Sequence, residues 1–142
     1  MSNILTPGEA RGLAQTAFEE ERAVAIAERE LALAKTELAR ARASREWWAV
    51  KATAMAYESG RIDGKNVEQR KVQLEAFLAE DKRLTEADEE IKALEDVATD
   101  REYLLAQAKA QARLAGRLFE IGLACLRSQE RVGPVVALGA AS

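Results

Sequence analysis

The sequence predicts an all-α protein: a long antiparallel helical hairpin, of the coiled-coil type, with a short extra helix after its turn. Three observations predict this fold. Alanine, glutamate, leucine, lysine and arginine dominate the 142 residues, a composition typical of long helices. The two prolines, Pro7 and Pro134, lie near the ends of the chain. Apolar residues recur at alternating steps of three and four, the heptad pattern of a left-handed coiled coil.

The first helix is expected over about residues 7–59. Thr6, Pro7 and Glu9 form a capping box with proline at the first helical position. A second, shorter apolar stripe (Ile26, Leu33, Trp47, Ala54) predicts that this helix contacts more than one neighbour. The seam of the helix is expected at Leu13, Ala17, Glu20, Val24, Ala27, Leu31, Ala34, Leu38, Ala41, Arg45, Trp48, Ala52 and Met55.

The chain is expected to reverse at a tip formed by residues 60–66. Gly60 suits a helix C-cap, and Asp63-Gly64 is a turn dipeptide. Asn66, followed by Gln69, imitates a capping box and starts a short helix at about 67–79. The apolar residues expected on one side of this short helix are Val67, Leu74, Phe77 and Leu78. The period then slips near residues 80–82, which predicts a kink or interruption with Asp81 or Thr85 as a new cap.

The last helix is expected over about residues 83–131. Gly133-Pro134 is predicted to end it and to leave a flexible tail at 132–142, all within a single domain of residues 1–142. The seam of this helix is expected at Leu84, Ala87, Ile91, Leu94, Ala98, Arg101, Leu105, Ala108, Ala112, Ala115, Phe119, Gly122 and Leu126.

The distribution of charge favours the antiparallel hairpin. Residues 1–34 carry 3 basic and 6 acidic residues, a net charge of −3, and residues 35–74 carry 9 and 5, a net charge of +4. Residues 75–102 carry 4 basic and 11 acidic residues, a net charge of −7, and residues 103–142 carry 5 and 2, a net charge of +3. Folding the chain at the tip places +4 beside −7 and −3 beside +3. Since each exposed ion pair contributes only ~0.2–1 kcal/mol, charge selects the orientation and apolar burial supplies most of the stability.

The sequence lacks the groups that common active sites need. There is no histidine, the most frequent general base and metal ligand, and Cys125 is the only cysteine. The acidic cluster of Glu86, Asp88, Glu89, Glu90, Glu95 and Asp96 cannot form a di-metal bundle site of the Glu-x-x-His type. We therefore expect no catalytic residues, no cofactor and no metal: a protein that is not an enzyme.

The N-terminus shows no signal-peptide pattern, and no apolar stretch approaches the roughly 20 residues that span a bilayer. The expectation is a cytoplasmic protein without membrane contact.

Two apolar features are candidate contacts with other copies or with another protein. Trp47 and Trp48 cannot both face one narrow seam, because neighbouring helix positions lie about 100° apart. The stretch 118–126 is apolar nearly all round, through Leu118, Phe119, Ile121, Leu123 and Leu126. Two intrachain alternatives stay open: Trp47 covers the 67–79 helix, or 118–126 packs as an ordinary helix end on residues 7–26.

The tip carries a cluster of basic residues, Arg61, Lys65, Arg70 and Lys71. This cluster could contact a nucleic-acid backbone or an acidic protein, or it could be a solvated turn. The net charge of −3 disfavours a dedicated nucleic-acid binder. The neighbouring series Arg40, Arg42, Arg45 and Lys51 has no aromatic platform interleaved in the way that single-strand binders need, and it is expected to pair with the acidic block opposite.

The segment Asp63-Gly64-Lys65-Asn66, followed by Glu68, Arg70, Lys71 and Leu74, resembles a stretch of small α-helical hairpin proteins encoded by tailed phages and prophages. The resemblance covers about residues 60–80. It implies a non-enzymatic structural or interaction protein with an assembly or accessory role, located in the host cytoplasm or the virion. The alternative it leaves open is an accessory factor in phage DNA metabolism that contacts nucleic acid, or a recombination or replication protein, through the basic tip region.

Overall fold

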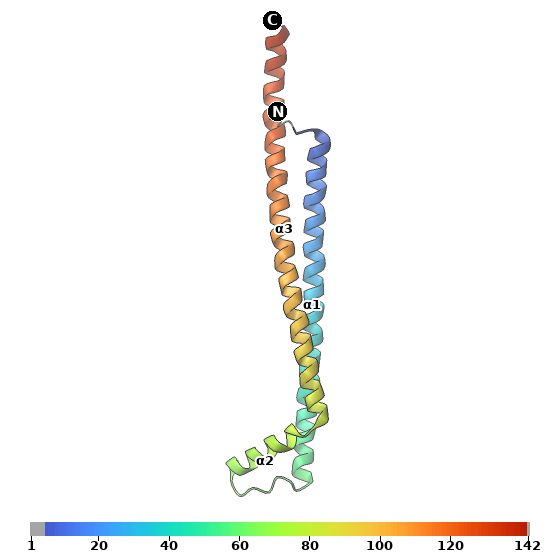
Figure 1. Cartoon of the computed structure of the whole chain (residues 1–142), viewed down its shortest axis with the longest axis vertical. Helices are drawn as coiled ribbons and strands as arrows, with labels where there is room; N and C mark the ends of the chain where they lie inside the picture. The colour runs from blue at the N-terminus through green and yellow to red at the C-terminus, as the bar shows by residue number, and fades with distance from the viewer. Residues whose placement is uncertain (1–4, 142) are drawn as a thin grey trace. The chain divides into compact units, whose positions relative to one another are not determined.

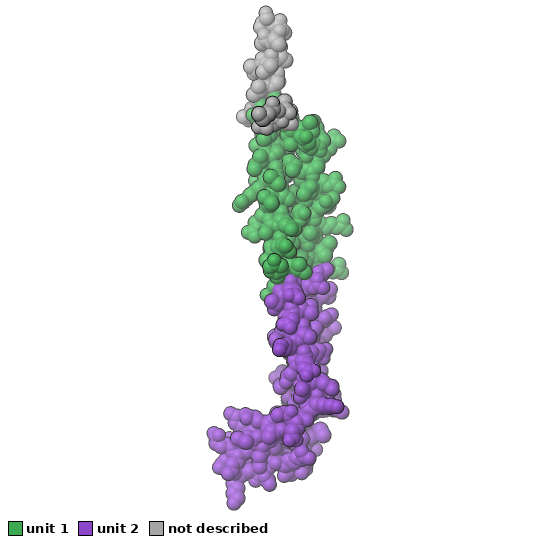
Figure 2. Space-filling model, in the orientation of Figure 1, with its two compact units in different colours: residues 1–29, 102–142 green, residues 30–101 purple. Residues whose placement is uncertain are grey.

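The computed structural model describes the backbone of residues 5–141 and the side chains of residues 5–130. Three helices make up most of this part: α1 (Pro7–Glu58), α2 (Val67–Ala79) and α3 (Lys82–Ala141) (Figure 1). The chain divides into two compact units, residues 1–29 with 102–142 (unit 1) and residues 30–101 (unit 2) (Figure 2). Within each unit α1 packs against α3, so the fold is an all-α helical hairpin. The sequence predicted one domain, and both long helices contribute to both units.

Unit 1 begins with the capping box that the sequence predicts. The Thr6 N–H donates to Glu9 Oε2 at 2.9 Å, and the Glu9 N–H donates to Thr6 Oγ1 at 3.1 Å. Leu5 and Leu13 then pack against α3 at Gly122, where an added Cβ would lie 3.1 Å from Leu5 Cδ2 and 2.8 Å from Leu13 Cδ1. The start of α1 is therefore held both by its cap and by a close approach to α3.

Unit 2 shows the direction in which the two long helices pair. Three interhelical ion pairs join Arg42 to Glu95 at 3.0 Å, Arg45 to Asp88 at 2.9 Å, and Arg101 to Glu30 at 2.9 Å. Residue numbers rise along one helix as they fall along the other, so the pairing is antiparallel. The predicted pairing of the basic series on α1 with the acidic block on α3 is confirmed at Arg42 and Arg45.

The covered positions of both long helices follow the predicted seams. All thirteen seam positions of α3, from Leu84 to Leu126, are buried or partly buried. On α1 every predicted seam position from Leu13 to Ala52 is also buried or partly buried. The most fully covered residues are small or branched aliphatic side chains: Leu31, Ala34, Leu38, Ala52, Ala56, Leu84, Ala98 and Ala115.

The seam of α1 differs from the prediction at its last position. Met55 is 61% exposed, whereas Ala56 has no exposed surface. The covered positions thus follow Trp48, Ala52 and Ala56, with two consecutive steps of four. An undistorted helix has 3.6 residues per turn, so its covered face drifts away from a strict 3.5-residue repeat. The heptad extrapolation to Met55 was therefore wrong by one residue.

The tip is built from one left-handed glycine and a network of side-chain amides. Gly60 has φ = +72°, a conformation that costs glycine no Cβ strain. The Gln73 side chain accepts from the Asp63 and Gly64 N–H groups at 3.1 and 2.9 Å and donates to Asp63 Oδ1 at 2.7 Å. These bonds fasten the loop to α2.

The N-terminus of α2 is capped as expected. Asn66 Oδ1 accepts from the Gln69 N–H at 2.8 Å, while Gln69 Oε1 accepts from the Lys65 N–H at 2.9 Å. The apolar side predicted for α2 holds in part, because Leu74, Phe77 and Leu78 are partly buried but Val67 is 71% exposed. Val67 is the first residue of the helix, next to the exposed tip, so little chain is available to cover it.

A break separates α2 from α3, as the slip in apolar period predicts. Asp81 caps α3, and its Oδ1 accepts from the Arg83 N–H at 2.9 Å and from the Leu84 N–H at 3.4 Å. Thr85 does not cap the helix; its hydroxyl donates to the Asp81 carbonyl at 3.1 Å. The predicted end of this helix at about residue 131 is corrected, because α3 continues through Gly133-Pro134 to Ala141. A proline within a helix removes one backbone donor and crowds the carbonyl four residues before it, at a cost of about 3 kcal/mol, and the other N–H groups can still continue the helix.

A substitution of Gly64, compared with the same substitution of Gly116, tests this account of the tip. A Cβ at Gly64 would lie 2.8 Å from Gln69 Cβ and 3.0 Å from the Arg70 backbone nitrogen, whereas a Cβ at Gly116 would meet nothing within 4 Å. We expect Gly64→Ala to lower the free energy of unfolding by about 1–3 kcal/mol, because backbone must shift. Gly116→Ala, within α3, should raise it by about 0.5–1 kcal/mol. Urea unfolding followed by circular dichroism measures both, and a stabilising Gly64→Ala change would contradict the account.

Candidate interaction surfaces

A second row of uncharged residues runs along α3 beside its seam. The row is Leu104, Gln107, Gln111, Leu114, Leu118, Ile121 and Cys125, with steps that alternate between three and four. All seven residues are exposed, and Leu114 and Ile121 each expose 60% of their surface. An apolar row at heptad spacing is what a helix presents to a neighbouring helix. The whole row lies in unit 1.

The structure divides the predicted contact residues of the 118–126 stretch into two groups. Phe119 and Leu126 belong to the seam with α1 and are partly buried, and Leu123 is also partly buried. Leu118 and Ile121 are 46% and 60% exposed. The stretch is apolar nearly all round because it serves two faces of the helix at once. The alternative in which residues 118–126 pack on residues 7–26 of the same chain therefore holds only for the face that belongs to the seam.

Two exposed leucines of this row, Leu104 and Leu114, are absent from the sequence prediction. The prediction selected the most apolar window, and Gln107 and Gln111 interrupt the row before that window begins. Extending the three–four alternation backwards from Leu118 would have found both leucines, because glutamine is uncharged and tolerated within such a row.

A groove runs along unit 1 between the exposed row of α3 and α1. It is lined by residues of both helices: Leu13, Thr16, Glu20, Gln111, Leu114, Ala115 and Leu118. Leu13, Glu20 and Ala115 are seam positions, so the groove opens from the α1–α3 seam to the surface. The α1 side carries small residues, because Gly12, Thr16 and Ala23 are exposed and a Cβ at Gly12 would meet open space.

In unit 2, Trp47 and Trp48 form a cluster with two cationic side chains. The two indole rings are T-shaped, with centroids 4.8 Å apart. Lys51 Nζ lies 4.0 Å from the Trp47 centroid, and the Arg83 guanidinium carbon lies 4.4 Å from the Trp48 centroid. Both distances suit cation–π interactions. Arg83 at the start of α3 thus contacts an aromatic residue of α1.

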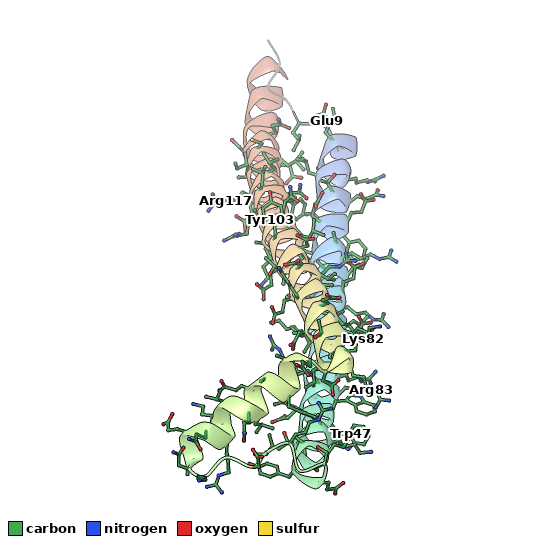
Figure 3. All side chains as sticks on the ribbon, turned by 60° about the horizontal axis from the view of Figure 1, so that its bottom comes forward. Glu9, Trp47, Lys82, Arg83, Tyr103 and Arg117 are labelled. Carbon is green, nitrogen blue, oxygen red and sulfur yellow. The ribbon has the colours of Figure 1, made fainter. Side chains whose placement is uncertain are left out.

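The two tryptophans differ in burial. Trp48 is a partly buried seam residue, whereas Trp47 is 52% exposed. Figure 3 shows Trp47 and Arg83 on the side of α1 away from α2, so this view does not support the alternative in which Trp47 covers α2. The stripe to which Trp47 belongs is exposed throughout, at Ile26, Leu33, Trp47 and Ala54. Trp47 is therefore available for contact with a partner.

The basic cluster at the tip is only partly occupied by internal contacts. The Arg61 guanidinium carbon lies 5.6 Å from the Phe77 ring centroid. The side chains of Lys65, Arg70 and Lys71 are exposed, and no ion pair involves them within residues 5–130. Three cations at the tip are thus accessible to an anionic partner.

Within residues 5–130, no group of three or more cysteine, aspartate or glutamate side chains is arranged to hold a metal ion. No buried side-chain nitrogen or oxygen there lacks a hydrogen-bond partner. Among the same residues no helix has the length and apolar character needed to cross a membrane.

No family model, curated protein or solved structure matches this chain. Its function must therefore be inferred from its own surfaces.

The unequal burial of the tryptophans gives a stability test. Trp48→Ala removes seam packing and the Arg83 contact, so we expect it to lower the free energy of unfolding by about 3 kcal/mol. Trp47→Ala removes mainly an exposed ring and its T-shaped contact, so we expect a loss of about 1 kcal/mol. Denaturant unfolding compares the two variants. A larger loss for Trp47→Ala than for Trp48→Ala would contradict the assignment of Trp48 to the seam.

Proposed function

We propose that this chain is a non-enzymatic structural or interaction protein that acts through self-association or by binding another protein. The observation that carries the proposal is the exposed row of uncharged residues on α3, with its large aliphatic side chains, beside a seam that is already filled by α1. Large exposed apolar patches are uncommon on monomers without a contact function. The exposed Trp47 supports it, because tryptophan is enriched in interface hot spots.

The pairing of α1 with α3 is, in this proposal, an antiparallel coiled coil. The regular alternation of covered positions supports the assignment, since steps of three and four persist over thirteen positions of α3. The small side chains at many of these positions would let the helices approach closely. Such a pairing leaves no room for an internal ligand, so the working surfaces are external.

A phage or prophage origin with an assembly or accessory role remains part of the proposal, on the resemblance of residues 60–80. Several residues that carry the resemblance have structural roles in the tip. Asp63 and Gly64 donate backbone N–H groups to Gln73, and Asn66 caps α2. On this proposal the protein acts in the host cytoplasm or within a virion.

A second candidate function is contact with nucleic acid, as an accessory factor in phage DNA metabolism. It is supported by the accessible cations Lys65, Arg70 and Lys71 beside Arg61. The pairing of Arg42 and Arg45 with acidic residues of α3 argues against a longer basic stripe on α1.

Solution mass and capture experiments test the leading proposal. Light scattering over a wide concentration range should show that the whole chain self-associates. If it does not, the immobilised chain should retain a specific protein, and Trp47→Ala or Leu118→Lys variants should retain less of it. Tyr103→Ala is the matched control, because Tyr103 is exposed on α3 outside the row. A chain that stays monomeric at every concentration and retains no protein would contradict the proposal.

The nucleic-acid candidate is tested by changing Arg61, Lys65 and Arg70 to alanine together. If the tip contacts a phosphate backbone, the triple variant should bind short duplex or single-stranded DNA more weakly, and wild-type binding should fall steeply with salt. The control removes the same charge from exposed arginines of unit 1, Arg11, Arg22 and Arg29. Fluorescence anisotropy gives the affinities. Equal losses in both triple variants, or binding insensitive to salt, would reject a specific role for the tip.

A further inference from the structure

We propose that unit 1 packs face to face on unit 1 of a second copy of the chain, forming a four-helix arrangement. This inference rests on the proposed function and names the partner of one surface. The surface has two parts. The α3 ridge consists of Leu104, Leu114, Leu118 and Ile121, and the α1 strip consists of the small residues Gly12, Thr16 and Ala23.

The ridge and the strip belong to one face of the unit. The groove that separates them is lined by Thr16 of the strip and by Leu114 and Leu118 of the ridge. The strip is part of a row on α1 whose residues are spaced by alternating steps of three and four residues, as in the ridge row. Each helix therefore presents one continuous row toward this face. The row on α1 is Gly12, Thr16, Glu19, Ala23 and Ile26. Arg117 lies on the side of α3 away from α1 (Figure 3), outside the ridge row but next to Leu114 and Ile121 in the helical spacing.

The shapes of the two rows make the face complementary to itself. Large aliphatic side chains protrude along α3, while α1 offers glycine, threonine and alanine with open space above Gly12. A two-fold axis parallel to the helices places the ridge of each copy on the strip of the other, and the two contacts are then identical, as an isologous interface requires. Alternation of large and small residues across facing helices is how bundle cores fill space.

The size of the face favours a hairpin over a lone helix as the occupant. The ridge row spans 22 residues from Leu104 to Cys125, and the 21 steps between these two ends rise roughly 32 Å at 1.5 Å per residue. Two helices about 8–10 Å apart make the face roughly 20 Å wide. The footprint is then roughly 600 Å², near the ~800 Å² of accessible surface that each partner buries in a stable interface. A single helix laid in the groove would leave much of either row exposed.

Charge supports the same arrangement. The ridge row contains no charged residue, and Glu19 is the only charge in the row of the strip. Leu13 packs at Gly122, so Arg117 lies near the level of residues 17–19 of α1. With the ridge of one copy on the strip of the other, Arg117 borders the interface beside Glu19 of the second copy. Arg117 has no ion-pair partner among the described residues, and Glu19 accepts a bond only from Gln15 there, at 3.1 Å.

The experiment compares the mass of full-length variants by sedimentation equilibrium under reducing conditions, which prevent disulfides through the exposed Cys125. The wild type should be a dimer. Leu118→Lys with Ile121→Lys should raise the dimer dissociation constant about a hundredfold or more, because two apolar side chains lose their burial. Helical content should not change, since both residues are exposed within one chain. Phe18→Lys is the control, because Phe18 is 66% exposed on α1 outside the strip row and should leave the dimer intact.

A charge exchange tests the geometry without altering the apolar surface. Arg117→Glu and Glu19→Arg should each weaken the dimer about two- to fivefold, as the loss of an exposed ion pair does. The two changes combined should restore the wild-type dissociation constant.

The inference is overturned if the wild type is monomeric, if the double lysine variant still dimerises, or if Phe18→Lys dissociates the dimer. A monomer that captures a foreign protein through the ridge, or a dimer that the ridge variants leave intact, would overturn the inference while the proposed function stands. A monomer that captures nothing would remove both.

Discussion

The whole structure depends on the apolar seam between α1 and α3. Both long helices depend on this seam, because most helix stability in proteins comes from packing of an apolar face. Alanine occupies many of the seam positions, and Ala34, Ala52, Ala56, Ala98 and Ala115 are among its most covered residues. Small side chains allow close approach of the helices but bury little area per residue. The seam must therefore be long to bury enough apolar area. In the proposed function, the surfaces that act on other molecules are the outer faces of the helices.

The tip and the charged flanks decide how this seam is assembled. A long alanine-rich helix could pair with a copy of itself in several registers, since alanine specifies register weakly. Gly60 turns the chain, and Gln73 fixes the loop onto α2, so α3 begins at a defined place. Asp81 then starts α3, and the ion pairs of Arg42 and Arg45 fall where opposite charges meet. Each of these contacts is modest in energy, but together they select one antiparallel alignment over its alternatives.

Much of this fold could be predicted from the sequence because its determinants are local. Caps, turn residues and heptad spacing depend on neighbours within a few positions, and Thr6, Asn66 and Asp81 act as their types suggest. The predictions that were wrong depended on more than a few neighbouring residues. Ala56 is covered in place of Met55 because the period of the helix drifts along its length, and α3 continues past Pro134. The division of residues 118–126 between two faces required knowing where α1 lies. The same holds for Leu104 and Leu114, whose exposure follows from the position of the partner helix rather than from their own surroundings in sequence.

The intrachain antiparallel alignment is tested most directly by a distance between two spin labels in unit 1. Glu21 and Arg113 are exposed and line one groove between α1 and α3, so labels at both positions, in a chain with Cys125 changed to serine, should lie close together. The account predicts strong dipolar coupling that persists when labelled chain is diluted with excess unlabelled chain before refolding. If the coupling disappears on dilution, the long helices pair between chains rather than within one. If no coupling is seen at any ratio, α1 and α3 do not share the seam described here.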